Sequence, residues 1–262
     1  MSRSQNLPVL PQVVGQVLKC LDDPNVGPRM LERLLERDPS ITAKILRVAN
    51  SAAYSNGQVA SVGRALGLLG IKSLRSLVVS VGYQQLTSGG QNSELFSRTG
   101  FWAHSLAVGT AARILARIRK PELAEELYTA GMMHDIGLLV IDRFLPDALD
   151  HAIAHAREEN QPVSSSLREV LGFSQAEVGG LLAERWELPE RIQSAIRYHL
   201  NPFEDPRHSE ASSIVGAANI LGHQCGFHDH VEGLELSLDP LMEATLEMPE
   251  EQLAVIRKVI EQ

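Results

Sequence analysis

A histidine and an aspartate stand side by side in the apolar segment GMMHDIGLLVI, which runs from Gly131 to Ile141. Both His134 and Asp135 are residue types that hold metal ions, and charged side chains are seldom fully buried unless they are paired or bound to a cation. On a single helix the two would point about 100° apart, so one ion could bind both only with ligands from other helices. A helix end with no site is the plain alternative for a lone His-Asp dipeptide.

Two further histidines occur in places where an imidazole needs an explanation. His104 lies in FWAHSLAV, an aromatic and apolar helical segment, and a buried imidazole there needs a hydrogen-bond partner or a ligand. His199 lies in AIRYHLNP at a predicted helix end, where the helix dipole favours a cation. Taken singly, a hydrogen-bonded core histidine and an ordinary helix-terminal histidine explain them.

The remaining histidines form patterns that resemble metal sites less well. His151 and His155 have the i, i+4 spacing that can chelate zinc, but Ala152 stands where a metalloprotease motif requires glutamate. A solvent-facing helix is the better interpretation. The segment HQCGFHDH carries four metal-binding side chains, His223, Cys225, His228 and His230. Their spacing matches no standard zinc pattern. The sequence contains neither a phosphate-binding glycine loop nor a serine nucleophile elbow.

Helical periodicity dominates the elements that must position these residues. Apolar residues recur at i, i+3 and i+4, as in the stretch 10–21, and no period-two run indicates a strand. Asp38 and Pro39 are typical of an N-cap and a first helical position, and Gly70 is typical of a helix end. Gly, Ser and Asn cluster in 87–94, which predicts a linker. The predicted class is all-α.

The composition excludes several classes of function. The chain has a net charge of −8, 44% hydrophobic residues and two distant cysteines. This composition predicts a cytoplasmic protein, and the sequence shows no secretory signal or membrane span. Nucleic-acid binding is disfavoured by this acidity. Residues 1–80 nevertheless hold ten basic and five acidic residues, a formal charge of +5. Solvated helix faces are the simplest explanation; a docking face for a partner is the alternative, with Lys44, Arg47, Arg64, Lys72 and Arg75 as its candidates.

Long segments of the chain resemble the HDOD proteins, the non-catalytic branch of the HD phosphohydrolase superfamily found in bacterial signalling. The resemblance covers roughly residues 7–223 and includes LPVLPQVV, LERDPSITAKILRVANSAAY, SVGRALGLLGIKSLRSLVV, GMMHDIGLLV and FSQAEVGGLLAERWELPERIQSAIRYHLNP. The DPS…NSA pattern is its most specific part. The resemblance implies an N-terminal helical bundle over residues 1–92 packed on an HD-like bundle over 93–224. Residues 225–262 form a C-terminal helical extension whose role the resemblance leaves open.

The same resemblance implies a metal site with missing ligands. In active HD enzymes a histidine, the HD dyad and a distant aspartate hold the metal, and further histidines serve a second ion. Here the first histidine and the dyad are present as His104, His134 and Asp135. Three expected ligands are replaced, by Gln175, by Leu200 after His199, and by Asn219 in place of the distant aspartate. We therefore expect no cofactor beyond one weakly held divalent ion.

The resemblance implies a regulatory role without catalysis, exerted by binding a signalling protein or a small ligand such as a nucleotide. Two alternatives remain. One is a metal-dependent phosphohydrolase that acts on a nucleotide or cyclic dinucleotide through His104, His134 and Asp135. The other is a nucleic-acid-associated regulator that uses the basic N-terminal face.

Overall fold

The computed structural model describes residues 12–23, 25–51, 59–87, 92–228, 230–231, 234 and 236–260. Throughout these residues the ordered elements are helices and none is a strand, which confirms the all-α prediction. The chain forms two compact units, Met1–Leu86 and Thr87–Gln262, so residues 225–262 belong to the second unit. In the same described part, no helix combines the length and apolarity that crossing a membrane requires.

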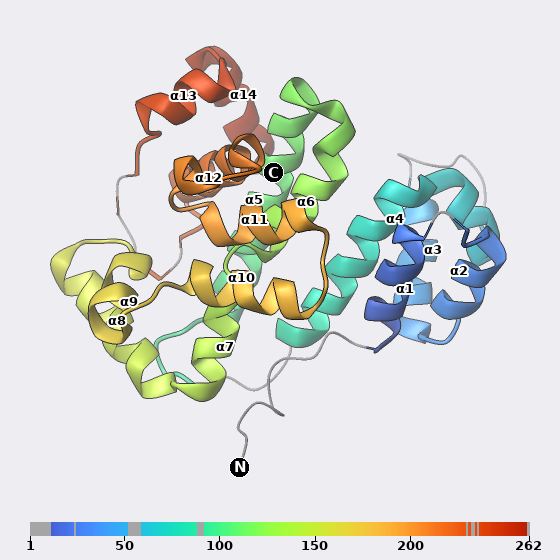
Figure 1. Cartoon of the computed structure of the whole chain (residues 1–262), viewed down its shortest axis with the longest axis horizontal. Helices are drawn as coiled ribbons and strands as arrows, with labels where there is room; N and C mark the ends of the chain where they lie inside the picture. Colours follow the sequence, from blue (N-terminus) through green and yellow to red (C-terminus); the bar gives the residue numbers. More distant parts are fainter. Residues whose placement is uncertain are drawn as a thin grey trace. The chain divides into compact units, whose positions relative to one another are not determined.

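The first unit contains α1 (Gln12–Asp22), α2 (Pro28–Leu35), α3 (Pro39–Ala49) and most of α4 (Val62–Thr87) (Figure 1). Its core is the predicted apolar stripe, with Val14 and Val17 of α1 fully buried. Asp38 Oδ1 accepts a hydrogen bond from the Ile41 N–H at 3.1 Å, which confirms Asp38 as the cap of α3. Helices of this length are stabilised mainly by burial of such stripes rather than by intrinsic propensity.

The NSA and Gly70 positions show how the turns of the first unit are built. The Asn50 side chain donates to the Val59 carbonyl at 2.8 Å and accepts from the Val59 N–H at 2.7 Å, so it joins the two ends of the segment between them. Gly70 has φ 71° and ψ 164°, a conformation that favours glycine. The predicted helix end is therefore a break inside α4, because helical backbone resumes directly after Gly70. Of the predicted linker, residues 88–91 lie outside the described residues.

The candidate docking residues are only partly described. Lys44 is half-buried and Arg47 exposed on α3, and Arg64 is exposed on α4. The side chains of Lys72 and Arg75 lie outside the described part of the chain. The docking face stays a prediction.

The second unit is a helical bundle that holds all the candidate ligands. Its helices are α5 (Arg98–Arg119), α6 (Ala124–Met133), α7 (Gly137–Phe144), α8 (Pro146–Glu159), α9 (Val163–Leu171), α10 (Gln175–Arg185), α11 (Glu190–Tyr198), α12 (Ser209–Gln224), α13 (Pro240–Leu246) and α14 (Glu250–Ile260), with 3-10 turns at Pro121–Leu123 and Pro202–Glu204. Helix α5 packs against α6 and α12, while α11 contacts α6, α10 and α12. Helices α13 and α14 lie against α12 (Figure 1). Four helices, α5, α6, α11 and α12, thus converge on one interior region.

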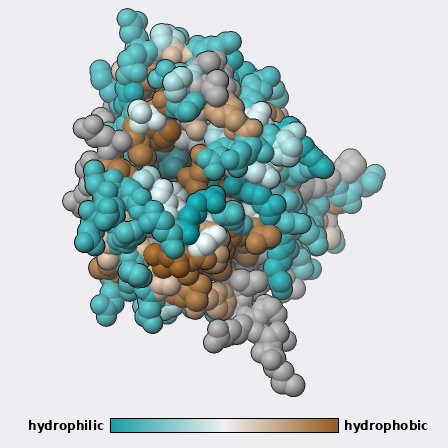
Figure 2. Space-filling view, turned by 60° about the vertical axis from the view of Figure 1, so that its left-hand side comes forward, coloured by the Kyte–Doolittle hydropathy of each residue, from teal (hydrophilic) through white to brown (hydrophobic). Residues whose placement is uncertain are grey.

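Two carboxylates hold the segment that leads into α5. Asp142 is fully buried, pairs with Arg98 and accepts from the Ser93 N–H at 2.8 Å. Asp150 accepts from the N–H groups of Glu94 at 2.9 Å and Leu95 at 2.8 Å. These bonds satisfy backbone donors of a segment that has no regular secondary structure. On the face shown in Figure 2, hydrophilic residues cover most of the surface and hydrophobic residues form smaller groups between them.

Candidate metal and ligand site

The His-Asp dyad lies in the turn that joins α6 to α7, not on one helix as the sequence suggested. Gly137 starts α7, and a Cβ there would lie 2.0 Å from the backbone carbonyl oxygen of Gln175. Only glycine permits this close approach. The contact brings the first residue of α10 beside the dyad, and a segment distant in sequence thereby joins the site.

Backbone carbonyls fix the orientation of three histidine rings around Asp135. His104 Nδ1 lies 2.7 Å from the Phe227 oxygen, His134 Nδ1 lies 2.7 Å from the Gly131 oxygen, and His199 Nδ1 lies 2.9 Å from the Ile196 oxygen. A carbonyl only accepts, so in each ring Nδ1 carries the hydrogen. Each Nε2 therefore faces inward. Metal-binding histidines show the same arrangement, with the outer nitrogen bonded to a carbonyl or carboxylate.

The inward atoms converge on a single carboxylate. His134 Nε2 lies 3.1 Å from His104 Nε2 and 3.2 Å from Asp135 Oδ2, while His104 Nε2 is 3.7 Å from that oxygen. His199 Nε2 lies 3.5 Å from the other oxygen, Oδ1. All four residues are buried, with at most 1% of each exposed. The structure thus brings together every predicted ligand that the sequence retains.

The charges in this cluster follow from burial and from the carboxylate. Burial lowers the pKa of His104 to about 3, so this ring is neutral. Burial alone would also lower the pKa of His134, but the neighbouring Asp135 carboxylate raises it above its ordinary value. The His134 imidazolium in turn holds the pKa of Asp135 well below its usual range against the opposing effect of burial. Asp135 therefore favours the form of His134 that carries a proton on Nε2, between His104 Nε2 and the carboxylate.

The donor set fits one divalent ion. His104, His134 and Asp135 offer ligand atoms that lie within 4.8 Å of one another. Two imidazoles and one carboxylate suit a borderline divalent ion. The further positions lack the required charge, because Gln175 donates its amide N–H to Asp135 Oδ1 at 3.0 Å and Asn219 is neutral. Leu200 offers no ligand atom.

His223 is a further member of the cluster, although the sequence analysis considered it only for a separate soft-metal site in HQCGFHDH. It follows Asn219 by four residues on α12, is 4% exposed, and its ring centroid lies 5.0 Å from that of His104. Burial lowers its pKa to about 4, so it is neutral at pH 7. Its i, i+4 spacing from Asn219 is the signal that would have found it.

The other candidate metal residues do not form a site. His151 is exposed and His155 bonds Glu169 at 2.7 Å, as a solvent-facing helix requires. His223 and His228 lie near each other, with ring centroids 6.1 Å apart, but the other two side chains point elsewhere: Cys225 Sγ lies 3.7 Å from the Arg257 oxygen, and His230 stacks on Phe96. The described part of this segment therefore provides one histidine to the cluster and no separate soft-metal site.

A cavity of about 280 Å³ lies beside the cluster, and we call it the α9–α12 cavity. It contains all four residues predicted at replaced or adjacent ligand positions, Gln175, His199, Leu200 and Asn219. Its other lining residues are Pro162, Ser164, Ser165, Arg168, Asn201, Gly216, Ile220, His223, Leu236 and Met242. The three retained ligands are absent from this wall, so they lie behind Gln175, His199 and Asn219.

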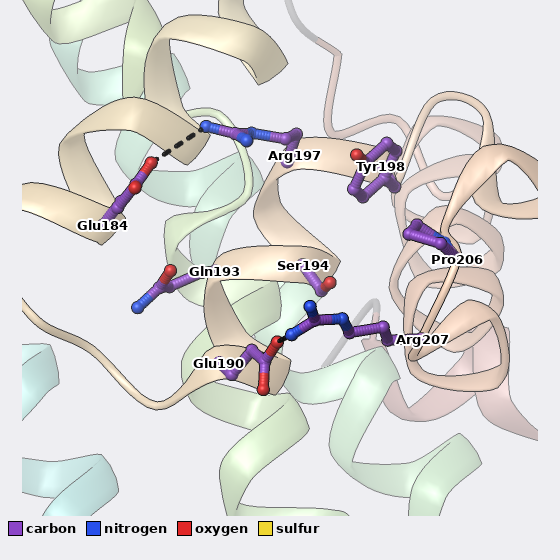
Figure 3. A pocket seen from close by; sticks show the side chains of 8 residues that line it. All are labelled: Glu184, Glu190, Gln193, Ser194, Arg197, Tyr198, Pro206 and Arg207. Atoms are coloured by element: carbon purple, nitrogen blue, oxygen red, sulfur yellow. Dashed lines mark hydrogen bonds and ion pairs between the residues drawn. The ribbon is translucent and has the colours of Figure 1, made fainter.

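A second cavity of about 370 Å³ lies on the outer side of α10 and α11 (Figure 3). Its charged side chains are paired with one another. Arg197 lies 3.4 Å from Glu184, and Arg207 pairs with Glu190. None of the predicted site residues lines this second cavity.

The helical bundle with an HD dyad at the α6–α7 junction defines this chain as a protein of the HD-domain class. A model of the HDOD domain matches residues 7–202, and the chain belongs to the HDOD family. This confirms the family that the sequence motifs indicated. The matched region ends before α12, which carries Asn219 and His223.

Similar proteins support this assignment. An HDOD domain protein from Geobacter sulfurreducens, described as having unknown function, has a structure with a TM-score of 0.72, 26% identity, and coverage of 98% of this chain and 93% of that one. A proposed phosphohydrolase from Shewanella amazonensis (TM-score 0.71, 24% identity, 98% and 96% covered) shares the fold. A Treponema pallidum protein, described as uncharacterized, is 26% identical over 227 residues, which are 83% of this chain and 42% of that protein. The chain spans less than half of that relative.

Proposed function

We propose that this chain is a regulatory module that binds a partner or small ligand and does not hydrolyse phosphate esters. The observation that supports this most directly is the 3.0 Å hydrogen bond from the Gln175 amide to Asp135 Oδ1. That oxygen is the one that does not face His104 and His134. An N–H donor bound to it occupies the position from which a second cation would bind the carboxylate. Two-metal hydrolysis needs that second cation to hold the attacking and leaving oxygens.

Access to the retained ligands supports the same conclusion. His104, His134 and Asp135 are each at most 1% exposed and lie behind the wall of the α9–α12 cavity. One ion held there would have a single negative ligand. Such an ion would join α5 to the α6–α7 turn rather than activate water.

This proposal is tested by measuring metal content and hydrolysis in the wild-type chain and in a variant that restores the three replaced ligands. The purified chain is loaded with Mn²⁺ or Fe²⁺, and metal content and hydrolysis of bis(p-nitrophenyl) phosphate are measured. We expect at most one ion per chain and no turnover. The variant carrying Gln175→His, Leu200→His and Asn219→Asp is expected to bind a second ion. Wild-type turnover that is lost in Asp135→Asn would refute the proposal.

The orientation of the histidines favours one second candidate, a single-metal phosphohydrolase. Three Nε2 atoms face Asp135 with their Nδ1 atoms bonded to carbonyls, which is the arrangement that metal ligation uses. This candidate requires a substrate to reach the ion past Gln175 and Asn219. The same assay decides between the two functions, because only the second candidate predicts turnover in the wild-type chain.

A further inference from the structure

We propose that the α9–α12 cavity binds a small phosphomonoester, with the phosphate at the first turn of α9 and the rest of the ligand against the amide oxygen of Gln175. This inference rests on the proposed function, since it assumes that the ligand is bound and left intact. His104, His134 and Asp135 are not among the described residues that line the cavity. The ester is then a signal rather than a substrate.

The first turn of α9 provides donors for the phosphate. Helix α9 has nine residues, begins after Pro162, and has no side-chain cap at that end. The N–H groups of Ser165 and Ser166 donate to the Pro162 oxygen, which leaves those of Val163 and Ser164 for a phosphate, and helix N-termini bind phosphate through such groups and the helix dipole. Ser164, Ser165 and Arg168 line the cavity from this helix. Arg168 is half-exposed and lies 3.4 Å from Glu177, an exposed pair that a phosphate can exchange for a stronger contact.

A buried acceptor that lines the same cavity independently indicates a ligand. Gln175 is 2% exposed, and its Oε1 has no hydrogen-bond partner among the described residues, while its Nε2 donates to Asp135. Asn219 also lines the cavity, but its side chain hydrogen-bonds His134. An unpaired buried acceptor is costly. A ligand that presents an N–H or O–H group satisfies Gln175 Oε1.

The charge and size of the cavity limit which ligands it can bind. Among the described residues, its lining contains one arginine and no carboxylate, although the chain carries a net charge of −8. An anion is therefore favoured. A volume of about 280 Å³ falls at the lower limit of typical ligand cavities, roughly 300–1,000 Å³. It suits a ligand no larger than a mononucleotide, and a cyclic dinucleotide is too large.

Calorimetric titration of the full chain with four probes tests the proposal. The probes are AMP, ribose 5-phosphate, inorganic phosphate and adenosine. We expect the two esters to bind at least tenfold more tightly than inorganic phosphate or adenosine, because only the esters contact both the first turn of α9 and Gln175. Arg168→Gln should weaken ester binding at least tenfold. Arg207→Gln, which removes a paired arginine from the second cavity, is the matched control and should leave binding unchanged (Figure 3).

Further readouts separate failure of this inference from failure of the proposed function. Leu236 and Met242 line the cavity, so ester binding should slow hydrogen exchange in residues 236–246. Absence of ester binding, or an equal loss in Arg168→Gln and Arg207→Gln, would overturn the ligand site. Equal affinity for inorganic phosphate and the esters would also overturn it. Phosphorus NMR of the mixture shows whether AMP stays intact. Binding with hydrolysis would refute the non-catalytic function while it upholds the site.

Discussion

Replacing His223 with glutamine changes how the stability of the second unit depends on pH. His223 is buried on α12, and burial lowers its pKa from 6.5 to about 4. The unfolded chain therefore binds a proton at this position at a higher pH than the folded chain does. The contribution of His223 to the free energy of unfolding is fully present above pH 6.5 and is lost as the pH falls toward 4, because protonation favours the unfolded state. Glutamine does not titrate and removes this loss.

The magnitude follows from the two pKa values. With values of 6.5 unfolded and about 4 folded, protonation favours unfolding by about 0.2 kcal/mol at pH 7 and by about 2 kcal/mol at pH 5. The wild-type chain should therefore lose about 2 kcal/mol more stability between pH 7 and pH 5 than His223→Gln does. The comparison is of slopes, so a constant loss caused by the substitution itself cancels.

Urea unfolding followed by tryptophan fluorescence measures this difference in the relevant unit. Both tryptophans, Trp102 and Trp186, belong to the second unit, so the signal reports that unit alone. His151→Gln is the control, because His151 is exposed on α8 and its replacement should leave the pH dependence unchanged. Equal losses between pH 7 and pH 5 in the wild-type chain and His223→Gln would show that His223 is not buried in its neutral form.

Two further substitutions test contacts that position the site. Gly137→Ala should destabilise the second unit by about 3 kcal/mol in thermal melts, since its Cβ would lie 2.0 Å from the Gln175 carbonyl. Gly67→Ala, where no atom lies within 4 Å of the new Cβ, should be neutral or slightly stabilising, and an equal loss in both would contradict the close contact. Asp150→Ala should speed hydrogen exchange at the Glu94 and Leu95 amides at least tenfold, because both donate to its carboxylate. Replacing the exposed carboxylate of Asp147 should leave hydrogen exchange at these two amides unchanged. Unchanged exchange in Asp150→Ala would show that other contacts hold the segment.

Local patterns predicted the helices well because each helix buries one continuous stripe. The same periodicity that buries Val14 and Val17 in the first unit also identified the all-α class. The Asp38 cap was predictable because it depends on residues within one turn. The Gly70 break was predictable from glycine's preference for helix ends, and helical backbone resumes after it.

The site was predictable where the family resemblance reached and less so beyond it. His104, the dyad, Gln175, His199 and Asn219 do lie together. His223 was missed because its neighbour Cys225 suggested a soft-metal motif, whereas the structure directs the two side chains to different surroundings. A helix end was one of the positions expected for the dyad, but the contact between Gly137 and the start of α10 was not predictable, because the two segments are distant in sequence.

The 3.1 Å approach of the His104 and His134 Nε2 atoms has a consequence for how the bundle is assembled. Two imidazole lone pairs repel each other at this distance, so α5 and α6 meet there only when a positive charge lies between them. A proton or a divalent ion can therefore hold the same pair of helices together. The fold is the same with either one, but replacing the proton with an ion changes the stability of the contact between α5 and α6.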